Sequence, residues 1–208
     1  MARKASPPQD RRSWAGRLIR NILLWIVPVA LDWMLLTPGY NRFLKTAAEN
    51  LLLLSESPNV TDLLTQDRHT THIRRRDFPP SRSLVGSVRV TDLHFHLVLL
   101  AALFLAVPDV PWRKRLENLG WAVLVTVFFD LFLCFFVVKA TYATRLGAWS
   151  LAHYGPFARN FYGLVRHLLD LPFKLGLPLL LWSGFYLGRM MEEMRDGGRA
   201  IVSRRERT

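Results

Sequence analysis

The chain has 208 residues, half of them hydrophobic, and carries a net charge of +12. Its apolar residues occur in long blocks and not at the 3.6- or 2-residue periods of a soluble domain, which predicts an α-helical integral membrane protein. The basic residues are divided among the flanks of these blocks and form no DNA-reading motif, so we expect no nucleic-acid partner.

Four apolar blocks predict four transmembrane helices, at residues 22–36, 97–107, 119–138 and 171–187. The third block, read as a helix, is about 30 Å long, which is the thickness of the hydrocarbon core of a bilayer. The second block is shorter, so a span there must include His94 and His96 in its outer turn. The fourth contains Pro172, Gly176 and Pro178, which a membrane helix tolerates where its neighbours satisfy the freed carbonyl groups.

Lys and Arg are densest in three short flanks, at residues 1–20, 111–117 and 188–208. With four spans, this bias predicts an inner (plasma) membrane protein with both termini in the cytoplasm. We divide the chain into a basic cytoplasmic tail (1–20), one membrane domain (21–192) and a second basic tail (193–208). No small-residue cleavage site follows the first block, which predicts an uncleaved anchor.

The two long connections, 38–92 and 140–170, are expected outside the membrane. In the first, Pro38 and Gly39 are expected to end the first span, and helical spacing predicts an amphipathic helix over 40–54, on the outer leaflet or capping the bundle. The β-prone segments 70–74 and 84–91 predict a small β-hairpin. In the second connection, helical spacing of Phe and Leu predicts another extracytoplasmic amphipathic helix over 156–169.

Two carboxylates lie within apolar blocks, Asp130 in the third and Asp32 in the first. A carboxylate in hydrocarbon costs about 3 kcal/mol or more, so it must face protein, a partner charge or water. One interpretation is a proton or substrate site inside the bundle, and the other is a buried carboxylate that sets the packing of the helices. Cys134 lies one turn from Asp130, and a thiol in apolar surroundings is usually inert.

Asp92, His94 and His96 cluster at the outer entrance of the second block. On a helix the two histidines would be about 200° apart and unable to share a metal, so we expect a hydrogen-bonded pair and no metal or cofactor. The alternative is a catalytic site at the outer leaflet built from Asp32, Asp92, His94 and His96, with Asp130 as a further candidate.

Two further features predict binding surfaces. Arg74, Arg75 and Arg76 form a basic cluster in the first outer connection that could bind anionic lipid headgroups or an acidic segment of a partner, or be a solvated loop. Gly184 and Gly188 form a Gly-x-x-x-Gly pair, which permits close packing of a partner helix.

The order of these parts resembles that of the small four-span membrane proteins associated with exosortases, of the exosortase H-associated type. The resemblance rests on LTPGYN at 36–41 leading into the helix at 47–54, on TDL at 91–93 leading into LLAALFLA at 99–106, and on WRKR at 112–115. It implies an accessory of a larger envelope sorting enzyme. Exosortases themselves use a Cys, Arg and His set, whereas Cys134 lies deep in a span and lacks the Ser-Gly context of those nucleophiles.

Three functions are therefore open. The first is a non-enzymatic inner-membrane protein that assembles with a larger membrane partner through Asp130, Gly184 and its outer surface. The second is a small intramembrane enzyme acting on a lipid or peptide at the outer leaflet, and the third is a subunit of an oligomeric transporter. An enzyme predicts outer polar residues that converge on one pocket, whereas an assembly protein predicts dispersed ones.

Overall fold

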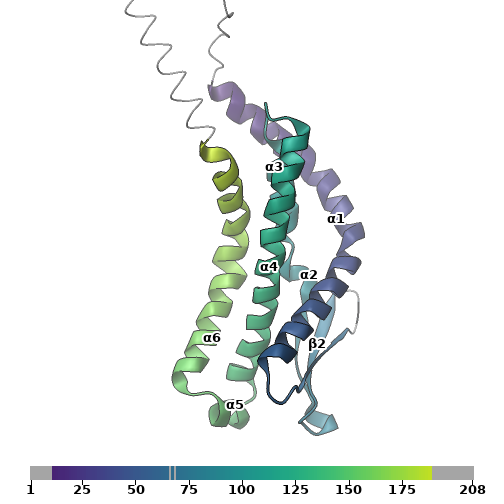
Figure 1. The fold of residues 1–208 in the computed structure, drawn as a ribbon, viewed down its shortest axis with the longest axis vertical. Helices are drawn as coiled ribbons and strands as arrows, with labels where there is room; N and C mark the ends of the chain where they lie inside the picture. The colour runs from purple at the N-terminus through teal and green to yellow at the C-terminus, as the bar shows by residue number, and fades with distance from the viewer. Residues whose placement is uncertain (1–10, 66, 68, 189–208) are drawn as a thin grey trace, which may run out of the picture.

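The computed structural model describes residues 11–65, 67 and 69–188, and it is mostly helical (Figure 1). In this part of the chain, three helices are long and apolar enough to cross a membrane: Trp14–Ser55, Trp112–Arg145 and Pro156–Gly188. The first two contain the expected first and third spans, and the last contains the expected fourth. The predicted C-terminal tail, 193–208, lies outside the described residues.

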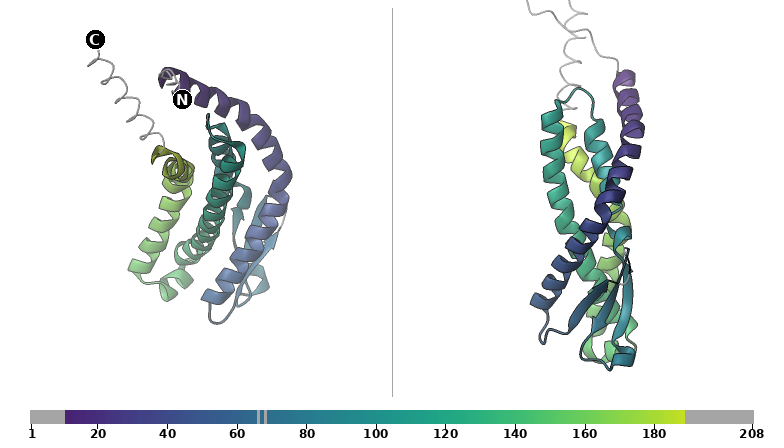
Figure 2. Two further views of the ribbon diagram at one scale, coloured as in Figure 1. Left: turned by 45° about the horizontal axis from the view of Figure 1, so that its top comes forward. Right: turned by 90° about the vertical axis from the view of Figure 1, so that its right-hand side faces the viewer.

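The first helix, α1 (Arg11–Ser55), continues through Pro28 and Pro38 for 45 residues. The predicted end of the helix at Pro38 is therefore wrong. Thr37 Oγ1 donates to the Trp33 carbonyl oxygen at 2.7 Å, and side-chain bonds of this kind, like prolines, bend helices without ending them. Figure 2 shows the resulting curvature of α1.

The last third of α1 packs on protein and not on a lipid surface. Its apolar face, Leu44, Ala48 and Leu52, is completely buried against the sheet and the long helix α4 (Trp112–Arg145). The amphipathic pattern over 40–54 was thus correctly read as helical, but it extends α1 and covers the sheet. A helix of this pattern buries its apolar stripe on whichever apolar surface the fold supplies.

The first long connection forms a three-stranded antiparallel sheet with the order β1-β2-β3, comprising β1 (Thr61–Thr65), β2 (Thr70–Arg75) and β3 (Leu84–Arg89). The predicted hairpin corresponds to β2 and β3, and the prediction missed β1. Leu63 and Ile73 are direct cross-strand neighbours, and both are buried. Because β1 has only five residues, it offers too little alternation to be recognised alone. A short 3-10 helix, η1 (Pro80–Arg82), precedes β3.

Two short helices follow the sheet, α2 (Val90–Leu93) and α3 (His96–Ala106). At 11 residues, α3 is about 16 Å long, roughly half the hydrocarbon thickness, and it is not among the membrane-length helices. Nearly all its residues are buried. Because protein encloses α3, its ends need not be satisfied in lipid, and the helix can be shorter than the hydrocarbon core.

After α4 the chain turns through α5 (Ala148–His153) into α6 (Pro156–Leu168), and a π-helical turn, η2 (Leu169–Phe173), joins α6 to the helix at residues 174–188. The helix predicted over 156–169 is present as α6, but it does not end there, since it forms one continuous helix with the fourth apolar block. The π turn accommodates Pro172, whose nitrogen cannot donate. Figure 1 shows the start of α1, the turn between α3 and α4, and the end of the last helix (yellow) at one end of the molecule, with the sheet and α5 at the other.

Candidate functional site: a buried polar cluster between the helices

Asp130 of α4 lies where α1, α3 and α4 meet, and its exposed fraction is 0%. Tyr40 Oη of α1 donates to Asp130 Oδ2 at 2.7 Å. His96, the first residue of α3, places Nε2 at 3.5 Å from Asp130 Oδ1. Tyr40 also packs against both apolar cores, the one under the sheet and the one between α3, α4 and the last helix. The three side chains therefore join three helices at the boundary of the two cores.

His96 is buried and poorly satisfied. Its exposed fraction is 3%, its ring lies edge-on to Phe129 at 5.9 Å, and within the described residues neither ring nitrogen makes a hydrogen bond. Asp130 Oδ1, which faces it, also has no hydrogen bond there. Unsatisfied polar atoms of this kind reduce stability, so this contact is the weakest polar contact of the cluster.

His94 is the opposite case, because both of its ring nitrogens are hydrogen-bonded. Trp33 Nε1 donates to His94 Nδ1 at 3.2 Å, so Nδ1 is an acceptor and Nε2 carries the proton. Nε2 in turn donates to Asn41 Oδ1 at 2.6 Å. These hydrogen bonds assign a neutral His94 ring with the proton on Nε2. Because both ring nitrogens are already hydrogen-bonded, His94 has a structural role and is not a free base.

The hydrogen bonds of His94 continue toward the sheet. Asn41 Nδ2 donates to Thr91 Oγ1 at 3.2 Å, and Thr91 Oγ1 lies 2.9 Å from Nδ1 of His69, just before β2. If Thr91 donates to His69, each residue of this series accepts a hydrogen bond from the residue before it and donates to the residue after it. This series ties α1 to α2 and to the start of the central strand β2, and the Tyr40 ring, 4.8 Å from the His94 ring, joins it to Asp130.

The structure thus brings together three of the predicted site residues, Asp130, His94 and His96. It adds Tyr40 and Asn41, which the sequence interpretation missed because it ended the helix at Pro38. The signal was present: a tyrosine and an asparagine that continue an apolar helix must find buried partners.

Asp32 and Asp92 lie apart from the cluster, and both are exposed. Asp92 pairs with Arg89 at 3.6 Å near the end of the sheet. Asp32 lies on the outward side of α1 and, among the described residues, makes neither a hydrogen bond nor an ion pair. The four-residue catalytic set proposed from the sequence is therefore not assembled in one place.

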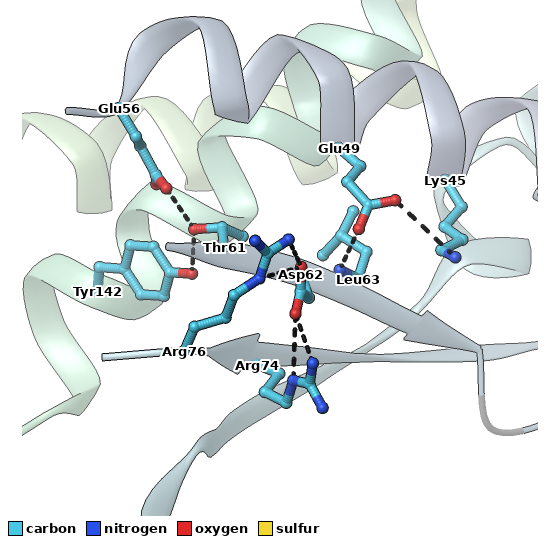
Figure 3. A network of polar contacts seen from close by, with 9 residues as sticks. All are labelled: Lys45, Glu49, Glu56, Thr61, Asp62, Leu63, Arg74, Arg76 and Tyr142. Atoms are coloured by element: carbon cyan, nitrogen blue, oxygen red, sulfur yellow. Dashed lines mark hydrogen bonds and ion pairs between the residues drawn. The ribbon is translucent and has the colours of Figure 1, made fainter. Parts of the chain in front are cut away.

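The predicted arginine cluster is paired within the chain. Figure 3 shows Asp62 of β1 between Arg74 and Arg76, with Arg74 Nη2 at 2.6 Å from Asp62 Oδ2. The hydrogen bonds from Arg76, followed by those from Arg74, lower the pKa of Asp62 to about 2. Arg75 points inward, pairs with Asp77 at 2.6 Å and lowers the pKa of that carboxyl.

Aromatic rings enclose the Arg75 guanidinium. Its carbon lies 4.2 Å from the ring centre of Trp149, 4.9 Å from Tyr142 and 5.2 Å from Phe78, which are cation–π distances. Close by, Lys139 pairs with Glu56 at 3.0 Å, and Thr61 donates to Glu56 and accepts from Tyr142. The charges at this end of the molecule therefore join the sheet to α1, α4 and α5.

Three further findings bear on chemistry. An open cavity of about 550 Å³ lies between the end of α4, α5 and the start of α6, and no candidate catalytic residue lines it. The described residues contain no group of three or more His, Cys, Asp or Glu placed to hold a metal. Cys134 is buried, whereas Gly184 is exposed, with nothing in the structure within 4 Å of where a Cβ would be.

Comparisons with protein-family models, with curated proteins and with solved structures find no match to this chain.

Proposed function

We propose that this chain is a non-enzymatic, multi-pass inner-membrane protein that assembles with a larger envelope membrane partner. The observation that supports this most is the enclosure of the candidate catalytic groups. Asp130 and His94 are completely buried, and their hydrogen bonds connect helix to helix. A general acid or base must come within hydrogen-bond reach of its substrate, and residues sealed by their own helices do not.

The proposed topology has α1, α4 and the helix Pro156–Gly188 crossing the membrane, with α2 and α3 as a fourth, protein-enclosed crossing. Both termini are cytoplasmic in this proposal. It is supported by the positions of the basic flanks, because the start of α1 and the turn before α4 lie at one end of the molecule (Figure 1). The basic flanks would also contact anionic headgroups, while the internal pairing of Arg74, Arg75 and Arg76 supports a structural role for those residues.

The partner in this proposal is a membrane enzyme of the exosortase type, on the strength of the sequence resemblance. The LTPGYN segment, one of the three places that carry the resemblance, contains Thr37, Tyr40 and Asn41. Tyr40 and Asn41 hydrogen-bond to Asp130 and His94 of the central cluster, and Thr37 hydrogen-bonds to the Trp33 carbonyl within α1. The residues that carry this part of the resemblance therefore have a structural role in this fold.

One observation favours a second candidate, a proton- or substrate-handling protein. His96 and Asp130 Oδ1 face each other without a hydrogen bond in the described structure, as a site poised to hold a proton would. Substitution of Asp130 by Asn separates the two candidates, because Asn keeps a hydrogen-bonding group but cannot ionise.

Gentle detergent extraction and affinity purification of the tagged protein, from the cells that make it, test the proposal. We expect a larger membrane protein to be recovered in a fixed ratio. A tagged multi-span protein of similar size, extracted in the same way, is the control for non-specific capture. Recovery of this chain alone, under conditions that keep control complexes intact, would reject the proposal.

A further inference from the structure

The outward side of α1 carries a carboxylate among exposed apolar residues. Asp32 is exposed, and Leu36, one turn away on the same side, is also exposed, at 60%. Leu31 and Leu35 beside it are also exposed. This surface is apolar except at Asp32.

The depth of Asp32 follows from contacts on either side of it along α1. Arg17 pairs with Asp109 at the turn between α3 and α4, 15 residues or about 22 Å before Asp32. Tyr40, which contacts Asp130, lies eight residues or about 12 Å beyond it. Asp32 is thus well within the apolar part of α1, and its short side chain cannot extend to the headgroups as Lys and Arg do.

Lipid chains offer no hydrogen bond to a carboxylate, so an Asp at this depth must face protein, a partner charge or water. Asp130 meets that need inside the chain, but Asp32 does not: the described residues provide it with no ion pair or hydrogen bond. Its partner must come from another molecule.

A second copy of this chain is a poor source of that partner. The sequence has no Lys or Arg between Arg20 and Arg42 of α1, nor between Arg115 and Lys139 of α4. In the last helix, Lys174 is mostly buried and pairs with Asp170 at 3.3 Å. The described spans therefore offer no exposed cation at the depth of Asp32.

We infer that Asp32 is an assembly contact that receives a Lys or Arg from a membrane-spanning helix of a different protein. This inference rests on the proposed function and names the chemistry of its partner. The leucines on either side supply the apolar packing, and the ion pair sets the register of the two helices. An intramembrane charge pair is favoured because the alternative for each group is an uncompensated charge in hydrocarbon.

Photo-crosslinking from the face of Asp32 tests this contact in the full-length protein. A photoreactive amino acid replaces Leu36, and a matched control replaces Leu180, which is similarly exposed on the last helix. We expect Leu36 to crosslink to a transmembrane peptide of another protein that contains Lys or Arg. Asp32→Leu should reduce that crosslink at least tenfold, while Asp32→Glu and the exposed-site control Asp92→Ala should retain it. Since Asp32 has no partner within the described chain, Asp32→Leu should melt at the wild-type temperature, which shows that loss of the crosslink is not misfolding.

The possible failures are distinguishable. Crosslinks from Leu36 only to lipid, to a second copy, or to a helix without Lys or Arg would overturn the contact, as would an Asp32→Leu protein that crosslinks normally. If affinity purification still recovers a stoichiometric partner in any of these cases, the assembly function stands and only the Asp32 surface is wrong. If neither method finds a partner, the assembly function fails and the inference fails with it.

Discussion

The sheet end of the molecule and the helix junction at Asp130 both bury polar groups, but they satisfy them to different degrees. At the sheet end, Asp62 has two arginine partners, and Arg75 has a carboxylate and three aromatic rings. At the junction, Asp130 has one good hydrogen bond, and His96 beside it has none in the described structure. The comparison indicates that the sheet end is built for rigidity, whereas the junction leaves a group that could change protonation or packing. The predictions below test that contrast.

The largest effect is expected at Arg75. Arg75→Ala removes a mostly buried cation, leaves Asp77 unpaired and opens a space between three rings, so we expect a loss of about 3–5 kcal/mol in the free energy of unfolding. Thermal melting in detergent measures it. Arg82→Ala, on the exposed turn before β3, is the matched control and should be nearly silent. If the two variants melt alike, the aromatic enclosure does not stabilise the sheet end.

His94 and His96 offer the sharpest internal comparison, since they are buried two residues apart. His94→Leu removes the two hydrogen bonds that the ring makes with Trp33 Nε1 and Asn41 Oδ1, so it should cost about 2–3 kcal/mol. His96→Leu removes no hydrogen bond and should change stability by less than about 1 kcal/mol. Equal losses in a melting experiment would show that His96 has a stabilising partner after all.

Asp130 separates packing from chemistry. In the assembly function, Asp130→Asn keeps a hydrogen-bonding group for Tyr40 and should preserve both stability and the complex, whereas Asp130→Leu leaves Tyr40 Oη unpaired at a cost of about 1–3 kcal/mol. Melting and affinity purification measure the two effects. A folded, fully assembled but inactive Asp130→Asn protein in a cell-based assay would instead establish the proton-handling candidate.

A smaller effect is expected from pH at the sheet end. The folded pKa of Asp62 is about 2, below its ordinary value of 3.8, so its ion pairs contribute stability above pH 4 that is lost as the pH falls toward 2. We expect a loss of roughly 1–2 kcal/mol, reduced because both arginines are partly exposed to solvent. Asp62→Asn should be less stable at neutral pH and should lose less than the wild type between pH 5 and 3. Parallel pH profiles for the two proteins would contradict the assignment.

The last prediction concerns topology and involves no change in stability. A cysteine at Ser81, on the exposed turn at the sheet end, should react with an impermeant maleimide in intact cells. A cysteine at Ser203 should react only after the cells are opened, because the basic flanks favour cytoplasmic termini. Cys134 is buried and serves as the background in the unsubstituted protein. The reverse labelling pattern would invert the proposed orientation.

Local pattern was sufficient for the helical class, the apolar helices and the two strands β2 and β3, because hydrophobic block length and alternation are properties of short segments. It was insufficient where a proline interrupts a pattern. Pro38 was interpreted as the end of the first helix, yet a bent helix continues through it. Pro172 was expected to be tolerated within the fourth block, and a π turn continues through it. Whether a helix ends at a proline depends on whether neighbouring groups satisfy the freed carbonyls. Those neighbours can be distant in sequence, so the local pattern does not reveal them.

By itself, the sequence determined that this protein has membrane-length apolar helices and that Asp130 needs a partner, since a carboxylate inside a long apolar block is costly unless it is paired or solvated. Only the tertiary structure decided what each polar residue meets. It paired Tyr40 with Asp130, satisfied His94 while leaving His96 without a hydrogen bond in the described chain, and placed Asp32 outward. These outcomes depend on how three helices rotate and cross, and that geometry is set by packing between segments distant in sequence.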